Sequence, residues 1–181
     1  MDVPRQFPAA VAYEGSIYVI GGANQEGATG SVARYDPNSA QWFSMADKPL
    51  PASEVQATVY EDKIYIPGGK IADQSISNQV EYFDPQSNTW ENGVDLPNPL
   101  SAYSLVTFEG KMMLFGGWDG QAYRSEVYVY DPGQEEWLYL TKMDSPRAYA
   151  GTVVIGNHIY IAGGTNDHEV FSDILVFRPN Q

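Results

Sequence analysis

Short stretches in which apolar and polar side chains alternate run along the whole chain. One of them is SEVYVYD at 125–131. Four other short and mostly apolar stretches share one form: AAVAY at 9–13, QATVY at 56–60, SLVTF at 104–108 and GTVVI at 151–155. A two-residue turn follows each stretch, and a second apolar run follows the turn. Alternation over such short lengths predicts β-strands joined as hairpins, and no segment has a convincing helical period. The pattern therefore predicts an all-β chain.

The second apolar run of each hairpin ends in a pair of glycines, and these pairs recur at nearly constant intervals. The first glycines of the pairs lie 47, 48 and 47 residues apart, at Gly21, Gly68, Gly116 and Gly163. An aromatic residue follows each pair, at Tyr35, Phe83, Tyr130 and Phe177, and a tryptophan lies seven residues after the first three, at Trp42, Trp90 and Trp137. Three landmarks in register predict four copies of one unit, with strands A to D in chain order.

These landmarks resemble the kelch repeat, in which an apolar strand ends in Gly-Gly and an aromatic residue and a tryptophan follow at fixed distances. The resemblance covers nearly the whole chain. It implies a kelch-type β-propeller with four blade-like repeats, each a twisted four-stranded blade around a central channel. Residues 1–181 are predicted to form a single propeller domain or part of one, with blades at about 4–47, 51–95, 99–143 and 146–181.

Residues that recur in every repeat are predicted to pack blades together, because a binding site rarely needs a copy in each repeat. A buried tryptophan removes about 150–250 Å² from water, so we expect Trp42→Ala to destabilise the fold. The glycine pairs are expected to permit close backbone approach or a positive φ. Pro67 lacks a backbone N–H and precedes a glycine pair, and is therefore expected to end strand B of blade 2 early.

The ends of the repeat array differ from its middle. The fourth repeat has strands A to C, and its strand D and tryptophan are missing. The segment 1–5 (MDVPR) matches 143–147 (MDSPR), which follows a strand D, so the N-terminus is not expected to supply the missing strand. Three alternatives follow: a segment of a longer protein, a ring completed by a second copy (two chains giving eight blades), or a closed four-bladed monomer.

Charge and composition restrict the classes of partner. Ten Lys and Arg against 23 Asp and Glu give a formal net charge of −13, which disfavours nucleic acid and anionic membrane surfaces. The chain has no Cys, so disulfides and thiolate catalysis are excluded. We find no signal peptide and no apolar run long enough for a membrane span, so a soluble chain of unassigned compartment is expected.

The kelch resemblance implies that partners dock on the face formed by the B–C and D–A loops. Nine residues on this predicted face are candidates for ligand binding: Phe7, Asn24, Glu54, Lys70, Tyr103, Trp118, Asp119, Tyr149 and Asn166. Trp118 breaks the repeat pattern, as an anchor for a partner or as a cover for the blade edge. The face has few cations, mainly Lys70 and Arg124, which argues against acidic peptides and leaves sugars, apolar peptides or basic peptides open.

Catalytic chemistry finds little support in the sequence. His158 is expected to be a solvated strand residue, and His168 a loop residue whose spacing to its acidic neighbours fits neither a zinc nor a calcium site. The prediction is a non-catalytic scaffold that binds a protein, a peptide or a carbohydrate, with no cofactor and no metal. The alternative is a sugar-active enzyme similar to the kelch sialic-acid mutarotases, in which Glu54 would act with Arg147 or Lys70.

Overall fold

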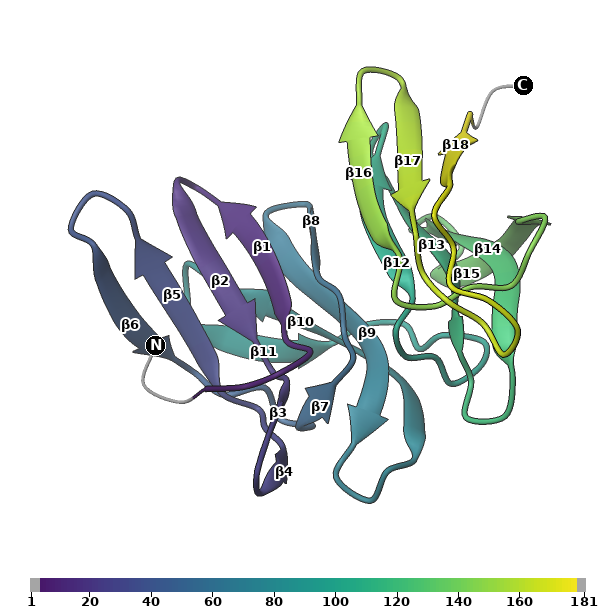
Figure 1. The fold of residues 1–181 in the computed structure, drawn as a ribbon. Helices are drawn as coiled ribbons and strands as arrows, with labels where there is room; N and C mark the ends of the chain where they lie inside the picture. Colours follow the sequence, from purple (N-terminus) through teal and green to yellow (C-terminus); the bar gives the residue numbers. More distant parts are fainter. Residues whose placement is uncertain (1–3, 179–181) are drawn as a thin grey trace.

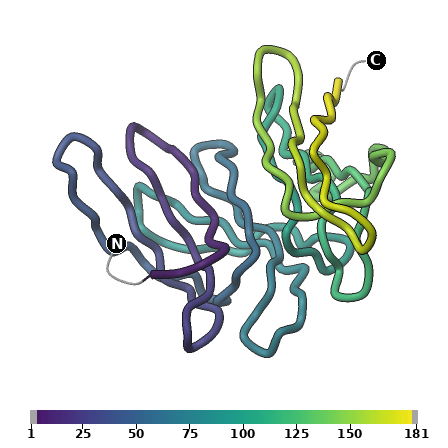
Figure 2. The backbone as a smooth tube through the Cα atoms, in the orientation of Figure 1, coloured from purple at the N-terminus to yellow at the C-terminus, as the bar shows by residue number. Residues whose placement is uncertain are grey.

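The computed structural model describes residues 4–178, which form four twisted antiparallel sheets and contain no helix. Figure 2 shows the four sheets following one another in chain order, and in Figure 1 blades 1 and 4 lie toward opposite sides of the view. The first strands of successive sheets contact one another, so the sheets are arranged radially with these strands innermost. The predicted four-bladed propeller arrangement is confirmed. No helix among the described residues is long and apolar enough to span a membrane.

Blades 1 and 2 each contain the four expected strands. In blade 1 the order from the inside is β1 (Ala9–Tyr13), β2 (Ser16–Ile20), β5 (Val32–Asp36) and β6 (Gln41–Met45), and the short strands β3 (Ala23–Asn24) and β4 (Gly27–Ala28) form the B–C loop. In blade 2 the order is β8 (Thr58–Tyr60), β9 (Lys63–Ile71), β10 (Ile76–Asp84) and β11 (Thr89–Asn92), with β7 (Ala52–Ser53) paired to the end of β9.

Blade 3 is complete and blade 4 has three strands. Blade 3 contains β12 (Ser104–Phe108), β13 (Lys111–Trp118), β14 (Tyr123–Asp131) and β15 (Glu136–Lys142). Blade 4 contains β16 (Gly151–Ile155), β17 (His158–Ala162) and β18 (Ile174–Phe177), so among the residues that the structure describes it has no outer strand, as predicted. Residues 1–3, on which part of the N-terminal sequence match rests, lie outside the described residues.

The expectation for Pro67 is wrong. Strand β9 continues through Pro67 to Ile71, and Pro67 lies opposite Val80. The register of β10 shifts between Ser77 and Val80, so the partner strand has an irregularity next to the proline. Such an irregularity removes the need for a ladder hydrogen bond from the missing N–H. The carbonyl oxygen of Pro67 is also used, because it accepts a hydrogen bond from the buried hydroxyl of Tyr103.

The tryptophans of strand D join each blade to the preceding one. Trp90 Nε1 donates to the Ala46 carbonyl of the blade 1–blade 2 connection at 2.8 Å, and Trp137 Nε1 donates to the Val94 carbonyl after blade 2 at 3.0 Å. Trp42 has no preceding blade within the described chain and is 40% exposed, against 7% for Trp137. The packing role is therefore observed for the second and third tryptophans, and Trp42 instead lies on an open blade face.

The glycine pairs allow adjacent blades to approach closely. Gly21, Gly68 and Gly116 have positive φ, and a Cβ atom at each would collide with a carbonyl oxygen of the connection into the next blade. At Gly163 of blade 4, which is followed by no further blade within residues 4–178, the nearest atom to such a Cβ is the Phe171 oxygen at 3.5 Å. Glycine is therefore required by contact between blades at the first three pairs.

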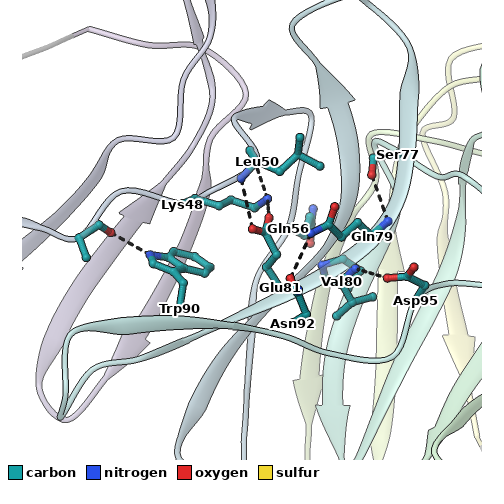
Figure 3. Close-up of polar contacts among 12 residues, drawn as sticks. Lys48, Leu50, Gln56, Ser77, Gln79, Val80, Glu81, Trp90, Asn92 and Asp95 are labelled. Carbon is teal, nitrogen blue, oxygen red and sulfur yellow. Dashed lines mark hydrogen bonds and ion pairs between the residues drawn. The ribbon is translucent and has the colours of Figure 1, made fainter.

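A buried ion pair, absent from our sequence interpretation, adds a polar contact between blades 1 and 2. Figure 3 shows Lys48, in the connection between these blades, beside Glu81 of β10. Lys48 Nζ also donates to the Leu50 carbonyl at 2.7 Å, and the Leu50 N–H donates to Glu81 Oε1 at 3.2 Å. Both charged side chains are almost completely buried, so each depends on the other for its stability in the core.

Candidate functional site

In each blade, one residue in the loop before strand A has the same unusual backbone conformation, with a positive φ. Phe7, Glu54, Ala102 and Tyr149 have φ values of 54°, 55°, 51° and 58°. The Glu54 N–H donates to the Phe7 carbonyl at 3.0 Å, Ala102 to Glu54 at 2.7 Å, and Tyr149 to Ala102 at 2.8 Å. These three hydrogen bonds form a backbone ladder around the centre of the propeller. The ladder fixes the main-chain positions from which the four side chains extend.

The B–C and D–A loops lie together on this face. Backbone pairs join them in all four blades, at Gln6 with Ala23, Ser53 with Lys70, Ser101 with Trp118, and Ala148 with Thr165. The two sets of loop residues predicted to form one face are thus adjacent in the structure. The resulting surface around the ladder is called the mouth face below.

Two neighbouring hollows that share lining residues occupy the mouth face. A cavity of about 330 Å³ is lined by Phe7, Pro8, Glu54, Val55, Gln56, Ala102 and Tyr149. A neighbouring cavity of about 220 Å³ is lined by Glu54, Lys70, Gln74, Ile76, Trp118, Gly120, Tyr123 and Tyr149. Glu54 and Tyr149 line both, so five of the nine predicted residues (Phe7, Glu54, Lys70, Trp118 and Tyr149) meet around one pair of hollows. A larger hollow of about 830 Å³ beside β3 and β4 has no aromatic residue in its described lining.

Aromatic rings form much of the wall of these hollows. The Phe7 and Tyr149 rings, from the first and last blades, lie 6.0 Å apart between centroids, and the two residues are 50% and 45% exposed. Trp118 packs against Tyr123 with ring centroids 4.8 Å apart. Large half-exposed aromatic side chains are the type of residue that anchors binding partners.

Glu54 lines both hollows together with these aromatic residues, and neighbouring groups contact its carboxylate. Ser101 Oγ donates to Glu54 Oε2 at 3.2 Å, and Lys70 Nζ lies 3.8 Å from Glu54 Oε1. Burial raises the pKa of Tyr149, and the hydrogen bond between its hydroxyl and Glu54 raises it further. The phenol therefore stays protonated and donates to the carboxylate at neutral pH.

Three predicted ligand residues instead build the loops that carry them. Asn24 Oδ1 accepts from the Glu26 amide, Asp119 Oδ1 from the Gln121 and Ala122 amides, and Asn166 Oδ1 from the His168 and Glu169 amides, at 2.7–3.1 Å. Partial burial alone would raise the pKa of Asp119, but these amides and Arg124 hold it below its ordinary value. Asn and Asp commonly form turns by accepting hydrogen bonds from backbone amides two or three residues later, so this structural role was recognisable from the sequence.

Tyr103 is placed away from the mouth face. Its side chain is fully buried in the core between blades 2 and 3, and burial raises the pKa of its phenol. A ligand at the mouth face therefore has no access to this ring. Its neighbour Ala102 takes the ladder position of this blade, and Tyr103, one residue later, packs into the core.

Arg147 is committed to its own blade. Its guanidinium donates to Asp173 Oδ1 at 2.9 Å and to the Gly163 carbonyl at 3.1 Å, and it lies 3.9 Å from the centroid of the Phe171 ring. Of the two cations considered for a sugar-active site, Lys70 is the one that approaches Glu54. His158 packs beside Tyr160, His168 is exposed in its loop, and no three His, Cys, Asp or Glu side chains converge within residues 4–178.

Comparison with known proteins gives consistent matches. A family model described as the KLHDC2/KLHL20/DRC7 Kelch-repeats domain matches residues 3–181. The chain is 28% identical over 170 residues to Kelch-like protein 35 of Mus musculus (93% of this chain, 29% of that protein) and 40% identical over 184 residues to Kelch-like protein 6 of Homo sapiens (99% and 28%). It is 25% identical over 193 residues to Beta-scruin of Limulus polyphemus (99% and 21%).

The solved structure of YjhT has the same arrangement of blades. It superposes with a TM-score of 0.77 at 16% sequence identity, covering 90% of this chain and 59% of that one. The chain therefore spans less than a third of the curated relatives named above and about three fifths of this structural neighbour.

Proposed function

Because the chain belongs to the kelch-repeat family, we propose that it is a non-catalytic scaffold that binds a protein or peptide on the mouth face. The observation that carries this proposal is the backbone ladder, whose hydrogen bonds use only main-chain atoms and which presents Phe7, Glu54 and Tyr149 around the hollows. Recognition by side chains on a rigid frame is how loop surfaces commonly bind partners. Two of the named relatives are Kelch-like proteins, which supports the same class of function.

Selection of peptides from a displayed library against the whole chain tests this proposal. We expect the selected peptides to lose binding to Tyr149→Ser and to retain it with Tyr139→Ser, a matched control on β15 that is 58% exposed. Removal of a central aromatic contact typically weakens binding by about 2 kcal/mol, which is roughly 30-fold. Equal binding of the selected peptides to both variants would contradict use of the mouth face.

A sugar-active enzyme is the second candidate, favoured by the Glu54 carboxylate with Tyr149 and Lys70 at one cavity. The same hollows would then hold a carbohydrate, with sugar rings stacked on the aromatic walls. Mutarotation of N-acetylneuraminate, followed by NMR, is expected to proceed at the uncatalysed rate with the wild-type chain. Acceleration that Glu54→Gln removes would establish the enzyme and overturn the scaffold proposal.

We also propose that two copies associate head to tail through the open faces of blades 1 and 4. The exposed face of blade 4 carries Val153, Ile155, Tyr160, Ile174 and Val176, and the exposed face of blade 1 carries Ile17, Tyr35 and Trp42. These two faces are equivalent to the two sides of the interfaces inside the chain, where Tyr18 of blade 1 meets Phe83 of blade 2. Two copies closing on each other in this way would form a ring of eight blades.

Sedimentation equilibrium tests the association. The expected mass is twice the 20.0 kDa of one chain, and Ile155→Asp is expected to give single chains because it buries an unpaired charge in the interface. Leu140→Asp is the matched control, since Leu140 is exposed on the outer strand β15 of blade 3. A monomer at tens of micromolar for the wild-type chain would overturn this proposal.

A further inference from the structure

We propose that the cavity lined by Phe7, Glu54 and Tyr149 binds a positively charged side chain, a lysine or an arginine of a protein partner, with Glu54 as its counter-charge. This inference rests on the proposed scaffold function and specifies the chemistry of its partner. Three features carry it: the aromatic walls, the loosely paired carboxylate, and the engagement of the neighbouring cations with other groups.

The aromatic walls suit a cation. Phe7 and Tyr149 both line the cavity, their rings are tilted by 55° with centroids 6.0 Å apart, and about half of each residue is exposed. A cation within about 6 Å of an aromatic centroid is attracted by the negative ring face, and the attraction grows when water is excluded. Phe7 is held in place by its ladder conformation, so this wall is formed before a ligand arrives.

The carboxylate is oriented, but its own cation is loosely held. Ser101 and Tyr149 donate to Glu54, whereas Lys70 Nζ stays 3.8 Å from Glu54 Oε1, beyond hydrogen-bond distance. Lys70 is one-third exposed, and a partly exposed ion pair of this kind contributes little to stability. Lys70 therefore can move into solvent when a partner's cation takes its place beside Glu54.

Other cations near the mouth face are already engaged. Arg124 Nε lies 3.1 Å from Asp119, and Arg147 is buried with Asp173 and the Phe171 ring. The chain as a whole carries a formal charge of −13. A cationic partner is therefore favoured at long range as well as at Glu54, and an anionic partner would meet repulsion at both scales.

Titration of the whole chain with small probes, followed by amide NMR shifts, tests this inference. The probes are N-acetyl-arginine amide and N-acetyl-lysine amide, with N-acetyl-glutamine amide and N-acetyl-glutamate amide as neutral and anionic controls. We expect the cationic probes to shift the amides of Glu54, Ala102 and Tyr149 with millimolar affinity. The neutral and anionic probes are expected to leave these amides unchanged.

Two substitutions are expected to change the affinity for the cationic probes in opposite directions. Glu54→Gln is expected to weaken binding of N-acetyl-arginine amide about ten-fold, and Lys70→Met to strengthen it several-fold by removing the competing ammonium. Lys63→Met, which removes a lysine paired with Asp84 away from the cavity, is the matched control and is expected to leave binding unchanged. Because Lys70→Met predicts a gain, a loss of folding in Glu54→Gln does not imitate the expected pattern.

Three results would overturn the inference: cationic probes that cause no shift, preferential binding of the anionic probe, or weaker binding to Lys70→Met. The scaffold proposal can be judged separately. If the selected peptides need Tyr149 but contain neither lysine nor arginine, the scaffold proposal stands and the proposal of a bound cation is contradicted. If the selected peptides bind independently of Tyr149, the proposal that partners bind on the mouth face is itself contradicted.

Discussion

Replacing Trp137 with alanine is expected to destabilise the chain far more than the same change at Trp42. A fully buried tryptophan removes about 150–250 Å² from water, or roughly 4–6 kcal/mol at about 25 cal/mol/Å². Trp137 is 7% exposed and its indole also donates to the Val94 carbonyl, which adds about 1 kcal/mol. Trp42 is 40% exposed and has no such bond, so its contribution falls to roughly 2–4 kcal/mol. We therefore expect a difference of about 2–3 kcal/mol between the two variants.

Urea unfolding followed by circular dichroism measures this difference. Both variants should be compared at low protein concentration, because association through blade 1 would bury Trp42 and hide the effect. Equal slopes against urea are needed, since a repeat array can lose cooperativity when one blade is weakened. If Trp42→Ala lowers the free energy of unfolding as much as Trp137→Ala does, then contact with a preceding blade is not what makes these tryptophans matter.

Three further substitutions test other contacts by the same unfolding measurement. Lys48→Met should lower the free energy of unfolding by about 3–5 kcal/mol, because it leaves the buried Glu81 carboxylate without its partner. Lys63→Met, at a partly exposed pair, should cost less than about 1 kcal/mol, and similar losses in the two variants would contradict this reasoning. Gly116→Ala should cost at least about 1 kcal/mol more than Gly163→Ala, since both have positive φ but only the first faces a carbonyl of a following blade, and equal losses would show that φ alone decides. The hydrogen bond from Lys63 and a backbone amide lower the pKa of Asp84 from 3.8 to about 2. Its contribution to stability is therefore complete above pH 4 and lost as the pH falls through 2, and Asp84→Asn should remove this part of the acid sensitivity; an unchanged profile would refute it.

The sequence predicted the blades well because their landmarks act within or between neighbouring units in a regular way. Glycines such as Gly68 recur since the next blade approaches each of them, and Trp90 recurs since each preceding blade offers a carbonyl. Trp42 is more exposed than the repeat pattern alone suggests, because the repeat supplies the residue but the described chain lacks the preceding blade. Pro67 was misread because its effect depends on an irregularity in the partner strand, which is not visible in a single stretch of sequence.

The candidate site was predicted in outline, and its details depend on geometry that the sequence does not contain. Alignment of the repeats placed Phe7, Glu54 and Tyr149 together, and the structure does bring them around neighbouring hollows. It could not distinguish Tyr103, which points into the core, from residues at the surface. Asn24 was chosen because it is polar and in a loop, whereas its side chain forms the turn. The Lys48–Glu81 pair has no equivalent in other repeats and therefore left no periodic signal.

The ladder at the centre of the propeller has a consequence for how recognition can change. Since its hydrogen bonds use only main-chain atoms, the ladder itself does not require particular side chains at positions 7, 54, 102 and 149. The present set, Phe, Glu, Ala and Tyr, already shows how different they can be. The binding surface can thus be varied while the ladder is kept, and the four positions form a natural site for randomisation when new binding proteins are sought from this framework.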